Sequence, residues 1–251
     1  GIEEIDYELL RSLPKLKLIS KYGVGLNNID NDACNEFEVK ISFTPGANKR
    51  SVAEFTLLLI LNSLRRIDLN KTEILNNVWS QKKGRGLYGK KIGILGMGNI
   101  GKELANLLQP FNAEVSFFDL LNLEKDSSIP ENITQVSFKK LIQSCEIISI
   151  HLPLTSDTKN ILGSEVFSKM KKDVILINTA RGGIADEDAL FSFLKNNPES
   201  FASFDVFETE PAFDNKLLSL DNFFATSHRA SLSLDGILSM GRAAIEGLVK
   251  Q

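Results

Sequence analysis

"KIGILGMGNIG", residues 91–101, joins an apolar run to an amphipathic segment through a glycine-rich turn. Gly96, Gly98 and Gly101 have the spacing G-x-G-x-x-G. Where a strand passes into a helix, the first glycine allows a tight turn, the second lets a pyrophosphate approach the backbone, and the third lets helix and strand pack closely. The start of the helix adds amide donors and partial positive charge. The stretch therefore predicts a dinucleotide-binding unit of alternating strands and helices.

The next apolar run, "EVSFFD", supplies the acidic residue that such a unit requires. Asp119 closes this run, 18 residues after Gly101. At about this spacing a carboxylate accepts hydrogen bonds from the hydroxyls of an adenosine ribose. A carboxylate there would repel a 2′-phosphate, so the sequence predicts NAD rather than NADP. The alternative is an aspartate that only closes a strand.

Short apolar runs alternate with amphipathic segments along most of the chain. The runs at 16–20, 91–95, 114–118, 146–150, 173–178 and 200–206 predict strands, and the segments at 99–111, 137–144 and 186–197 predict helices. Strands that alternate with helices form right-handed βαβ units around a parallel sheet that is buried on both faces. We therefore expect an α/β fold.

Composition excludes several classes of protein. The 251 residues are 43% hydrophobic, which is typical of a globular chain, and the net charge of −3 argues against a nucleic-acid partner. The longest apolar run, residues 55–64, is too short to span a bilayer and predicts a buried helix. Cys34 and Cys145 have no spacing typical of a disulfide framework or a metal site. These features predict a cytoplasmic protein without a structural metal or a membrane segment.

Three polar residues that follow apolar runs are candidates for catalysis. Arg181 lies in "NTARGG", Glu210 in "FDVFETEP" and His228 in "TSH". In a parallel sheet such positions share the carboxyl edge, where ligands bind. An arginine can grip a carboxylate and polarise a carbonyl, a histidine can donate a proton to the nascent alkoxide, and a glutamate can fix the tautomer of that histidine. Individually, each could also be an ordinary surface or loop residue.

The second histidine, His151 in "ISIHLPLT", ends an apolar run before Pro153 and has no acidic residue at comparable spacing. We interpret it as structural or as lining the adenine side of the dinucleotide site.

Taken together, the motifs resemble the D-isomer-specific 2-hydroxyacid dehydrogenase family, and most closely its D-3-phosphoglycerate dehydrogenase branch. The matching segments occur in the family's order over nearly the whole chain: "YGVGLNNID", "TPGANKRSVAE", "GKKIGILGMGNIGKEL", "HLPLTSDTKNIL", "INTARGGIADEDAL", "DVFETEP" and "SHRAS". The resemblance implies an NAD-dependent oxidoreductase that acts on a small 2-hydroxy or 2-oxo acid.

The resemblance also implies roles for individual residues. It makes Arg181, Glu210 and His228 catalytic, and it places the carboxylate of the substrate on the backbone amides of Val24 and Gly25. A "GVG" segment offers such a nest to an anion on physical grounds as well. The cofactor-binding residues that it implies are Gly96, Gly98, Asn99, Ile100, Gly101, Asp119, Leu152, Pro153, Thr179, Ala180, Arg181, Asp205, His228 and Ala230.

The implied architecture has two domains. A Rossmann-type, doubly wound NAD-binding domain over residues 50–230 is inserted into a smaller, flavodoxin-like substrate domain made of residues 1–49 and 231–251. We expect this substrate domain to be incomplete at its N-terminus, because the family begins with a further strand–helix–strand section. The segment from Ser51 through Trp79 resembles the family's dimerisation region and predicts a homodimer.

Several residues depart from the family's pattern. Asn27 replaces an Asp, Phe43 an Asn and Ser227 a Pro, and "RA" follows His228 where an aliphatic residue and glycine are common. Lys21 stands where phosphoglycerate-type members carry an arginine. It is either a ligand for a substrate phosphate, held as a point charge, or a solvated lysine that precedes a loop.

The predicted reaction is hydride transfer between NAD and a D-2-hydroxy acid such as 3-phosphoglycerate, or the corresponding reduction of glyoxylate or hydroxypyruvate. One alternative is an NAD-sensing regulatory or interaction protein on the same fold. Another is an NAD-dependent hydrolase, which would need catalytic residues of its own.

Overall fold

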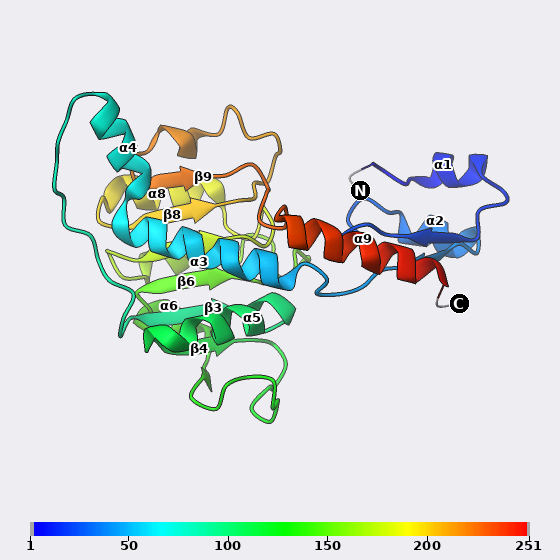
Figure 1. Cartoon of the computed structure of the whole chain (residues 1–251), viewed down its shortest axis with the longest axis horizontal. Coiled ribbons are helices and arrows are strands. Elements are labelled where there is room, and N and C mark those ends of the chain that lie inside the picture. Colours follow the sequence, from blue (N-terminus) through cyan, green and yellow to red (C-terminus); the bar gives the residue numbers. More distant parts are fainter. Residues whose placement is uncertain (1–2, 250–251) are drawn as a thin grey trace. The chain divides into compact units, whose positions relative to one another are not determined.

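The computed structural model describes residues 3–249; the outermost residues of the predicted substrate domain, 1–2 and 250–251, lie outside this range. The chain divides into two compact units (Figure 1). The larger unit runs from residue 52 to residue 230. The smaller unit combines the residues up to 51 with those from 231 onward.

A parallel sheet of seven strands forms the centre of the larger unit, in the order β5-β4-β3-β6-β7-β8-β9. Every neighbouring pair in this sheet is parallel. Its strands are β3 (Lys91–Leu95), β4 (Glu114–Phe118), β5 (Thr134–Gln135), β6 (Ile147–Ile150), β7 (Ile175–Asn178), β8 (Phe201–Phe204) and β9 (Phe223–Ala225).

The order of the strands reverses next to β3. From β3 the chain first builds outward through β4 and β5, and then returns to add β6 on the other side. A crevice opens at the carboxyl ends of the strands where the direction of winding reverses, and ligands of open α/β sheets bind there. The residues that follow β3, β4, β6, β7 and β8 are therefore the ones to inspect for a site.

Helices cover both faces of this sheet. Alternate residues of β7 belong to different hydrophobic clusters. Ile175 and Ile177 pack with α3 and α5, whereas Leu176 packs with α6, α7 and α8. α3 crosses the near face in Figure 1. The helices are α3 (Lys49–Arg65), α4 (Ile67–Leu75), α5 (Asn99–Leu108), α6 (Phe138–Ser144), α7 (Ser164–Ser168) and α8 (Glu187–Asn196), with short 3₁₀ turns at Gln109–Phe111 and Lys216–Ser219.

The ends of these helices follow from local chemistry. The side chain of Ser137 caps α6, and that of Asp186 caps α8 by accepting from the backbone N–H groups of Asp188 and Ala189. The helix expected over 99–111 is shorter than predicted: α5 ends at Leu108 and a 3₁₀ turn follows. Pro110 accounts for the change, because it has no N–H to continue the helical ladder.

The smaller unit contains a two-stranded parallel sheet, β1 with β2. A small cluster of Leu10, Ile29, Ala33, Cys34 and Val39 forms its core. Its elements are α1 (Tyr7–Ser12), β1 (Leu18–Ser20), α2 (Asn31–Glu36), β2 (Lys40–Ser42) and α9 (Leu234–Val249). The sequence did not predict β2 or β5 as strands, because both are short and only partly buried.

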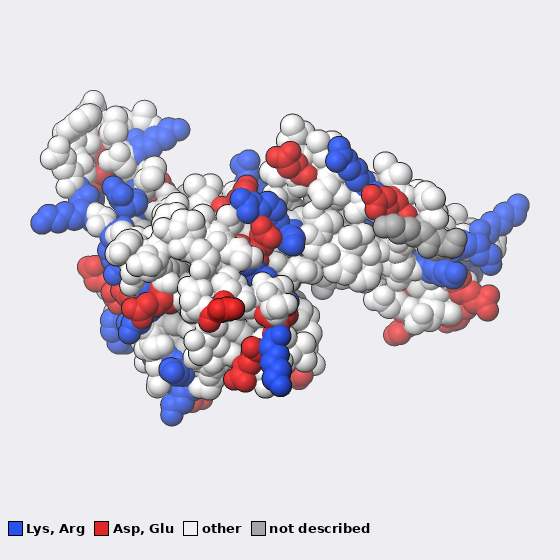
Figure 2. Space-filling view, turned by 60° about the horizontal axis from the view of Figure 1, so that its bottom comes forward, with Lys and Arg blue, Asp and Glu red and all other residues white. Residues whose placement is uncertain are grey.

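The apolar run at 55–64 lies in α3, where Leu59, Ile60 and Leu64 are buried as expected. No helix within residues 3–249 has both the length and the apolar character needed to cross a bilayer. On the face shown in Figure 2, basic and acidic side chains are interspersed.

Candidate active site

The glycine-rich turn lies between β3 and α5, at the carboxyl edge of the larger sheet. Gly96 has a φ of +95°, and a Cβ there would lie 2.7 Å from the carbonyl oxygen of His151. A Cβ on Gly101 would lie 2.3 Å from the carbonyl oxygen of Gly96. These two glycines are therefore required by the protein's own backbone.

Gly98 is different, because no heavy atom lies within 4 Å of the Cβ it would carry. It occupies the N-cap position of α5, where no side chain caps the first backbone N–H groups. The start of this ten-residue helix thus offers free amide donors and partial positive charge over an open cradle. Asn99 and Ile100, the first residues of α5, lie at this end.

Asp119 lies directly after β4, the strand that neighbours β3. One carboxylate oxygen, Oδ2, accepts from the backbone N–H of Met97 at 2.8 Å, and Oδ1 accepts from that of Leu121 at 3.0 Å. The carboxylate is thereby fixed beside the glycine turn. An open cradle at an uncapped helix start, next to a fixed carboxylate, fits the pyrophosphate and ribose of an NAD molecule.

The cradle predicts that Gly98→Ala weakens NAD binding without affecting folding. The new methyl group meets no protein atom, so the melting temperature should stay within about a degree of the parent. It would occupy the space for the pyrophosphate, and the dissociation constant of NAD should rise roughly tenfold or more. Gly86→Ala, also at a position with open space, is the matched control. Unchanged NAD affinity in Gly98→Ala would place the pyrophosphate elsewhere.

The segment after β7 carries Arg181. Asn178 holds this segment: its Oδ1 accepts from the N–H of Ala180 at 3.0 Å, and its Nδ2 donates to the carbonyl oxygen of Arg181 at 2.9 Å. Arg181 Nη1 donates to the carbonyl oxygen of Ala180 at 2.7 Å. Thr179 is buried and shares a hydrogen bond of 2.8 Å with Thr56 of α3. The turn that presents the guanidinium is therefore fixed at both sides.

Electrostatics connect Arg181 to the segment after β8. Burial lowers the pKa of the Arg181 guanidinium, and the nearby Glu210 carboxylate opposes that shift. The two segments also touch through Gly182, where a Cβ would lie 1.9 Å from the carbonyl carbon of Phe207. Position 182 therefore has no room for any residue but glycine.

Glu210 and His228 form a direct pair. Glu210 Oε2 and His228 Nδ1 lie 2.8 Å apart, and Glu210 Oε1 accepts from the N–H of Phe207 at 3.0 Å. The other ring nitrogen of His228, Nε2, is not used by this pair. His228 has a φ of +51°, an uncommon conformation for a residue with a side chain. The structure thus brings Arg181, Glu210 and His228 together at one edge of the larger unit.

Asp205 holds the segment that contains His228 in its uncommon backbone conformation. Its carboxylate is fully buried: Oδ1 accepts from Thr226 Oγ1 at 2.5 Å and from the N–H of Arg229 at 2.9 Å, and Oδ2 accepts from the N–H of Ala230 at 2.9 Å. Its carbonyl oxygen accepts from the N–H of His228 at 2.8 Å. The family resemblance implies that Asp205 binds the cofactor, and these contacts show a carboxylate that also anchors the segment around His228.

His151 and Leu152 follow β6, beside the glycine turn. His151 Nε2 and Ser149 Oγ share a hydrogen bond of 2.8 Å, and burial lowers the pKa of His151 to about 3. The imidazole is therefore neutral near pH 7 and is not available as an acid. Its Nδ1 is enclosed and has no partner among the described residues. Leu152 is buried, and Pro153 follows it toward solvent.

The remaining predicted site residues lie in the smaller unit, after β1. Gly23 has a φ of +107°, and the backbone N–H groups of Val24 and Gly25 have no acceptor among residues 3–249. Two free donors in one turn can bind an anion. Lys21 is 8% exposed, so it is not the solvated lysine that one interpretation of the sequence expected.

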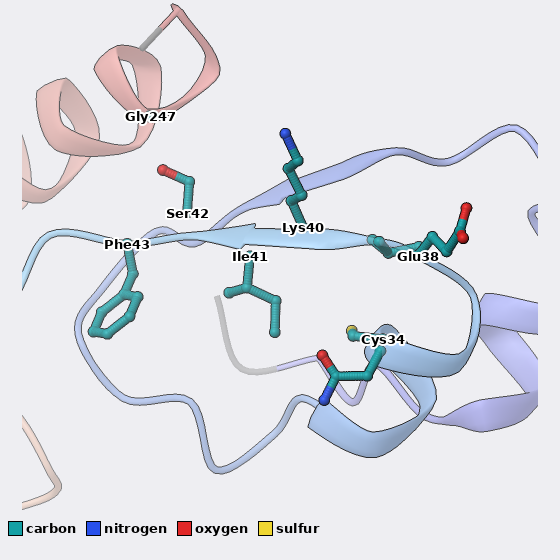
Figure 3. A pocket seen from close by; sticks show the side chains of 9 residues that line it. Cys34, Glu38, Lys40, Ile41, Ser42, Phe43 and Gly247 are labelled. Atoms are coloured by element: carbon teal, nitrogen blue, oxygen red, sulfur yellow. The ribbon is translucent and has the colours of Figure 1, made fainter. Parts of the chain in front are cut away.

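A separate cavity of about 740 Å³ lies along β2 in the smaller unit (Figure 3). Lys40 and Ser42 point to one side of the strand, toward the helix that carries Gly247, and Ile41 and Phe43 point to the other. None of the predicted site residues lines it. Within residues 3–249, no group of three or more His, Cys, Asp or Glu side chains could hold a metal ion.

Comparison with known families places this geometry in context. The model of the family described as "D-isomer specific 2-hydroxyacid dehydrogenase, NAD binding domain" matches residues 57–230. This range includes the glycine turn, Asp119, Arg181, Glu210 and His228.

Curated relatives have three different activities in their names. The chain is 36% identical over its whole length to the hydroxypyruvate reductase of Thermotoga maritima and covers 86% of it. It is 35% identical over 98% of its length to the D-3-phosphoglycerate dehydrogenase of Bacillus subtilis, of which it spans only 47%. It is 31% identical over 98% of its length to the glyoxylate reductase of Korarchaeum cryptofilum and covers 76% of it.

Solved structures share the fold. An NAD-dependent formate dehydrogenase from Staphylococcus aureus, in complex with NAD, has a TM-score of 0.87 and 30% identity over 98% of this chain and 75% of its own. A D-lactate dehydrogenase from Aquifex aeolicus, in complex with NAD and lactic acid, has a TM-score of 0.86 and 29% identity over 98% of this chain and 80% of its own.

Proposed function

Because the chain belongs to the D-isomer-specific 2-hydroxyacid dehydrogenase family, we propose that Arg181, Glu210 and His228 carry out its chemistry. The chain is an NAD-dependent oxidoreductase of small 2-oxo and 2-hydroxy acids. The observation that most supports the proposed roles is the 2.8 Å hydrogen bond between Glu210 and His228 at the edge that also carries Arg181.

In the direction of reduction, bound NADH supplies a hydride to C2 of the acid. Arg181 holds the carboxylate with its planar fork and polarises the carbonyl oxygen. His228 donates the proton on Nε2 to that oxygen as negative charge develops. Glu210, bound to Nδ1, keeps the ring in the required tautomer and stabilises its positive charge. Within the smaller unit, motif similarity supports the free N–H groups of Val24 and Gly25 as donors to an anionic group of the substrate.

The family resemblance suggests an assignment of the two units. We place NAD and the catalytic residues in the larger unit, as a Rossmann-type domain, and retain the smaller unit as the proposed substrate domain. Motif similarity supports the D-3-phosphoglycerate dehydrogenase branch, but identities of 36%, 35% and 31% to relatives with three activities leave hydroxypyruvate, 3-phosphoglycerate and glyoxylate as candidate substrates. We retain a cytosolic location as a prediction, supported by the free, buried Cys34 and Cys145.

A homodimer is supported by apolar side chains on α4 and the segment after it. Ile67, Ile74, Leu75, Val78 and Trp79 are between 48% and 82% exposed. α4 and this segment extend beyond the sheet in Figure 1. Contiguous apolar groups of this kind mark protein interfaces. Trp79→Glu should shift the protein to the monomer in sedimentation experiments if this surface joins two copies.

The reaction itself is tested by mixing the protein with NADH or NADPH and a panel of 2-oxo acids. We expect oxidation of NADH with at least one small acid, and weaker activity with NADPH because Asp119 repels its 2′-phosphate. Binding of NADH without turnover of any acid would favour an NAD-sensing protein. Preference for NADPH would contradict the role of Asp119.

A further inference from the structure

Lys21 lies at the start of the glycine turn in the smaller unit. It follows β1 directly, and its backbone N–H donates to the carbonyl oxygen of Ser42 at 2.8 Å. Its side chain does not extend into solvent, because the residue is only 8% exposed. A lysine this buried must have its charge compensated by neighbouring groups.

One partner of the Lys21 ammonium lies at the far end of the same turn. Lys21 Nζ donates to Asn28 Oδ1 at 2.6 Å, across seven positions of sequence. The side-chain nitrogen of Asn28, Nδ2, donates to the backbone carbonyl oxygen of Glu3 at 2.5 Å. The backbone carbonyl oxygen of Asn28 accepts from the N–H of Ile5 at 2.8 Å. Lys21 and Asn28 thus join the two ends of the turn and connect it to the N-terminal segment.

The turn closed by the hydrogen bond between Lys21 and Asn28 contains two backbone N–H groups without an acceptor. Val24 and Gly25, whose N–H groups have no acceptor within residues 3–249, lie between Lys21 and Asn28. The direction in which those N–H groups point depends on the turn keeping its shape. A buried positive charge at its base also favours an anion on the turn.

We infer that Lys21 is a positioning residue that closes the carboxylate-binding turn, and that the substrate is a small 2-oxo acid without a phosphate group. This inference rests on the proposed function and specifies the substrate class for the same site. A lysine that binds a substrate phosphate must present its ammonium to the ligand. Here the ammonium is enclosed and bonded to Asn28, and withdrawing it would leave Asn28 Oδ1 without this donor.

Burial and the carboxylate of Glu3 act on this group in opposite directions. Burial lowers the pKa of Lys21, and Glu3 raises it.

The experiment compares hydroxypyruvate with its 3-phosphate ester as substrates for four proteins. These are the parent, Lys21→Met, Asn28→Ala and the double variant, and Lys17→Met, which removes an exposed lysine of the same unit, serves as the control. The parent should prefer hydroxypyruvate. Each single variant should raise the KM for both acids by the same factor, about tenfold, with little change in kcat or in NAD affinity. The double variant should be no worse than the poorer single variant, because the two side chains share one bond.

Two results would overturn the inference. One is a KM that rises for the phosphate ester alone in Lys21→Met while Asn28→Ala changes nothing. The other is a parent that prefers the ester. Lys21→Arg decides the matter if Lys21→Met does not fold: a closing residue predicts a higher KM for both acids because the larger guanidinium does not fit, whereas a phosphate ligand predicts an equal or lower KM for the ester.

The outcome is separable from that of the proposed function. If the parent reduces no acid, the proposed function fails, but the bond between Lys21 and Asn28 can still be measured in thermal unfolding. Shifts in melting temperature that are not additive between the single and double variants would support the closing role. Additive shifts would contradict it.

Discussion

His228→Ala is expected to lower the turnover of a 2-oxo acid by about 10²–10⁴-fold, the usual contribution of a positioned proton donor. Nε2 is the ring nitrogen left for the substrate once Nδ1 binds Glu210. The affinity for NADH should change far less than the turnover, because the glycine turn and Asp119 lie on other strands. Steady-state turnover and fluorescence titration with NADH measure the two quantities separately. Normal turnover in the alanine variant would assign the proton to another group.

Glu210→Gln should also lower the turnover of the 2-oxo acid, but by less than His228→Ala does. Oε1 and Oε2 accept from Phe207 and His228 respectively, and a glutamine has only one oxygen to serve both. The variant also lacks the negative charge beside the protonated imidazole, so turnover of the 2-oxo acid should fall. Glu208→Gln, in the same segment, is the matched control. If Glu210→Gln turns over the acid as fast as the parent, the carboxylate does not act through His228.

Arg181→Lys is the second large effect, with an expected loss of roughly 10²–10³-fold in kcat/KM, comparable to removing a donor from an oxyanion-binding site. A lysine keeps a positive charge but cannot reproduce the planar fork. One arm of the fork is already engaged, since Nη1 donates to the carbonyl oxygen of Ala180. An ammonium in this buried place would also lose its proton more readily than the guanidinium does.

Kinetics at several pH values test this prediction. The loss should deepen as the pH rises and the lysine is deprotonated, while the dissociation constant of NAD should change much less than kcat/KM. Arg85→Lys, at an arginine paired with Asp173 outside the candidate site, controls for the loss of a guanidinium in general. A lysine variant with nearly normal kcat/KM would mean that the carboxylate is held by other groups.

The features that the sequence predicted well are those encoded locally. The alternation of apolar runs and amphipathic segments gave β3, β4, β6, β7 and β8 of the larger sheet, and the spacing of Gly96, Gly98 and Gly101 gave the turn between β3 and α5. The order of strands and the rule that ligands bind at the carboxyl edge then suffice to bring Arg181 near Glu210. None of these steps requires knowledge of distant contacts.

The features that the sequence did not predict depend on contacts between distant residues. Asp205 anchors groups that lie 21 to 25 positions later. Asn178, at the end of β7, was not identified although it fixes the turn before Arg181. A polar residue that ends an apolar strand is the signal that could have found both. The burial of Lys21 depends on Asn28 and on the packing of the N-terminal segment, which no local pattern reports.

Transfer of a labelled hydride tests the central claim most directly. The parent protein is incubated with NADH that carries deuterium at both C4 positions and with the 2-oxo acid, other than glyoxylate, that it reduces best, and the product is analysed by mass spectrometry and by chiral chromatography. The account predicts one deuterium on C2 of a D-2-hydroxy acid, and no such product from the His228→Ala variant on the same timescale. A product of the L configuration, or one without deuterium at C2, would contradict it.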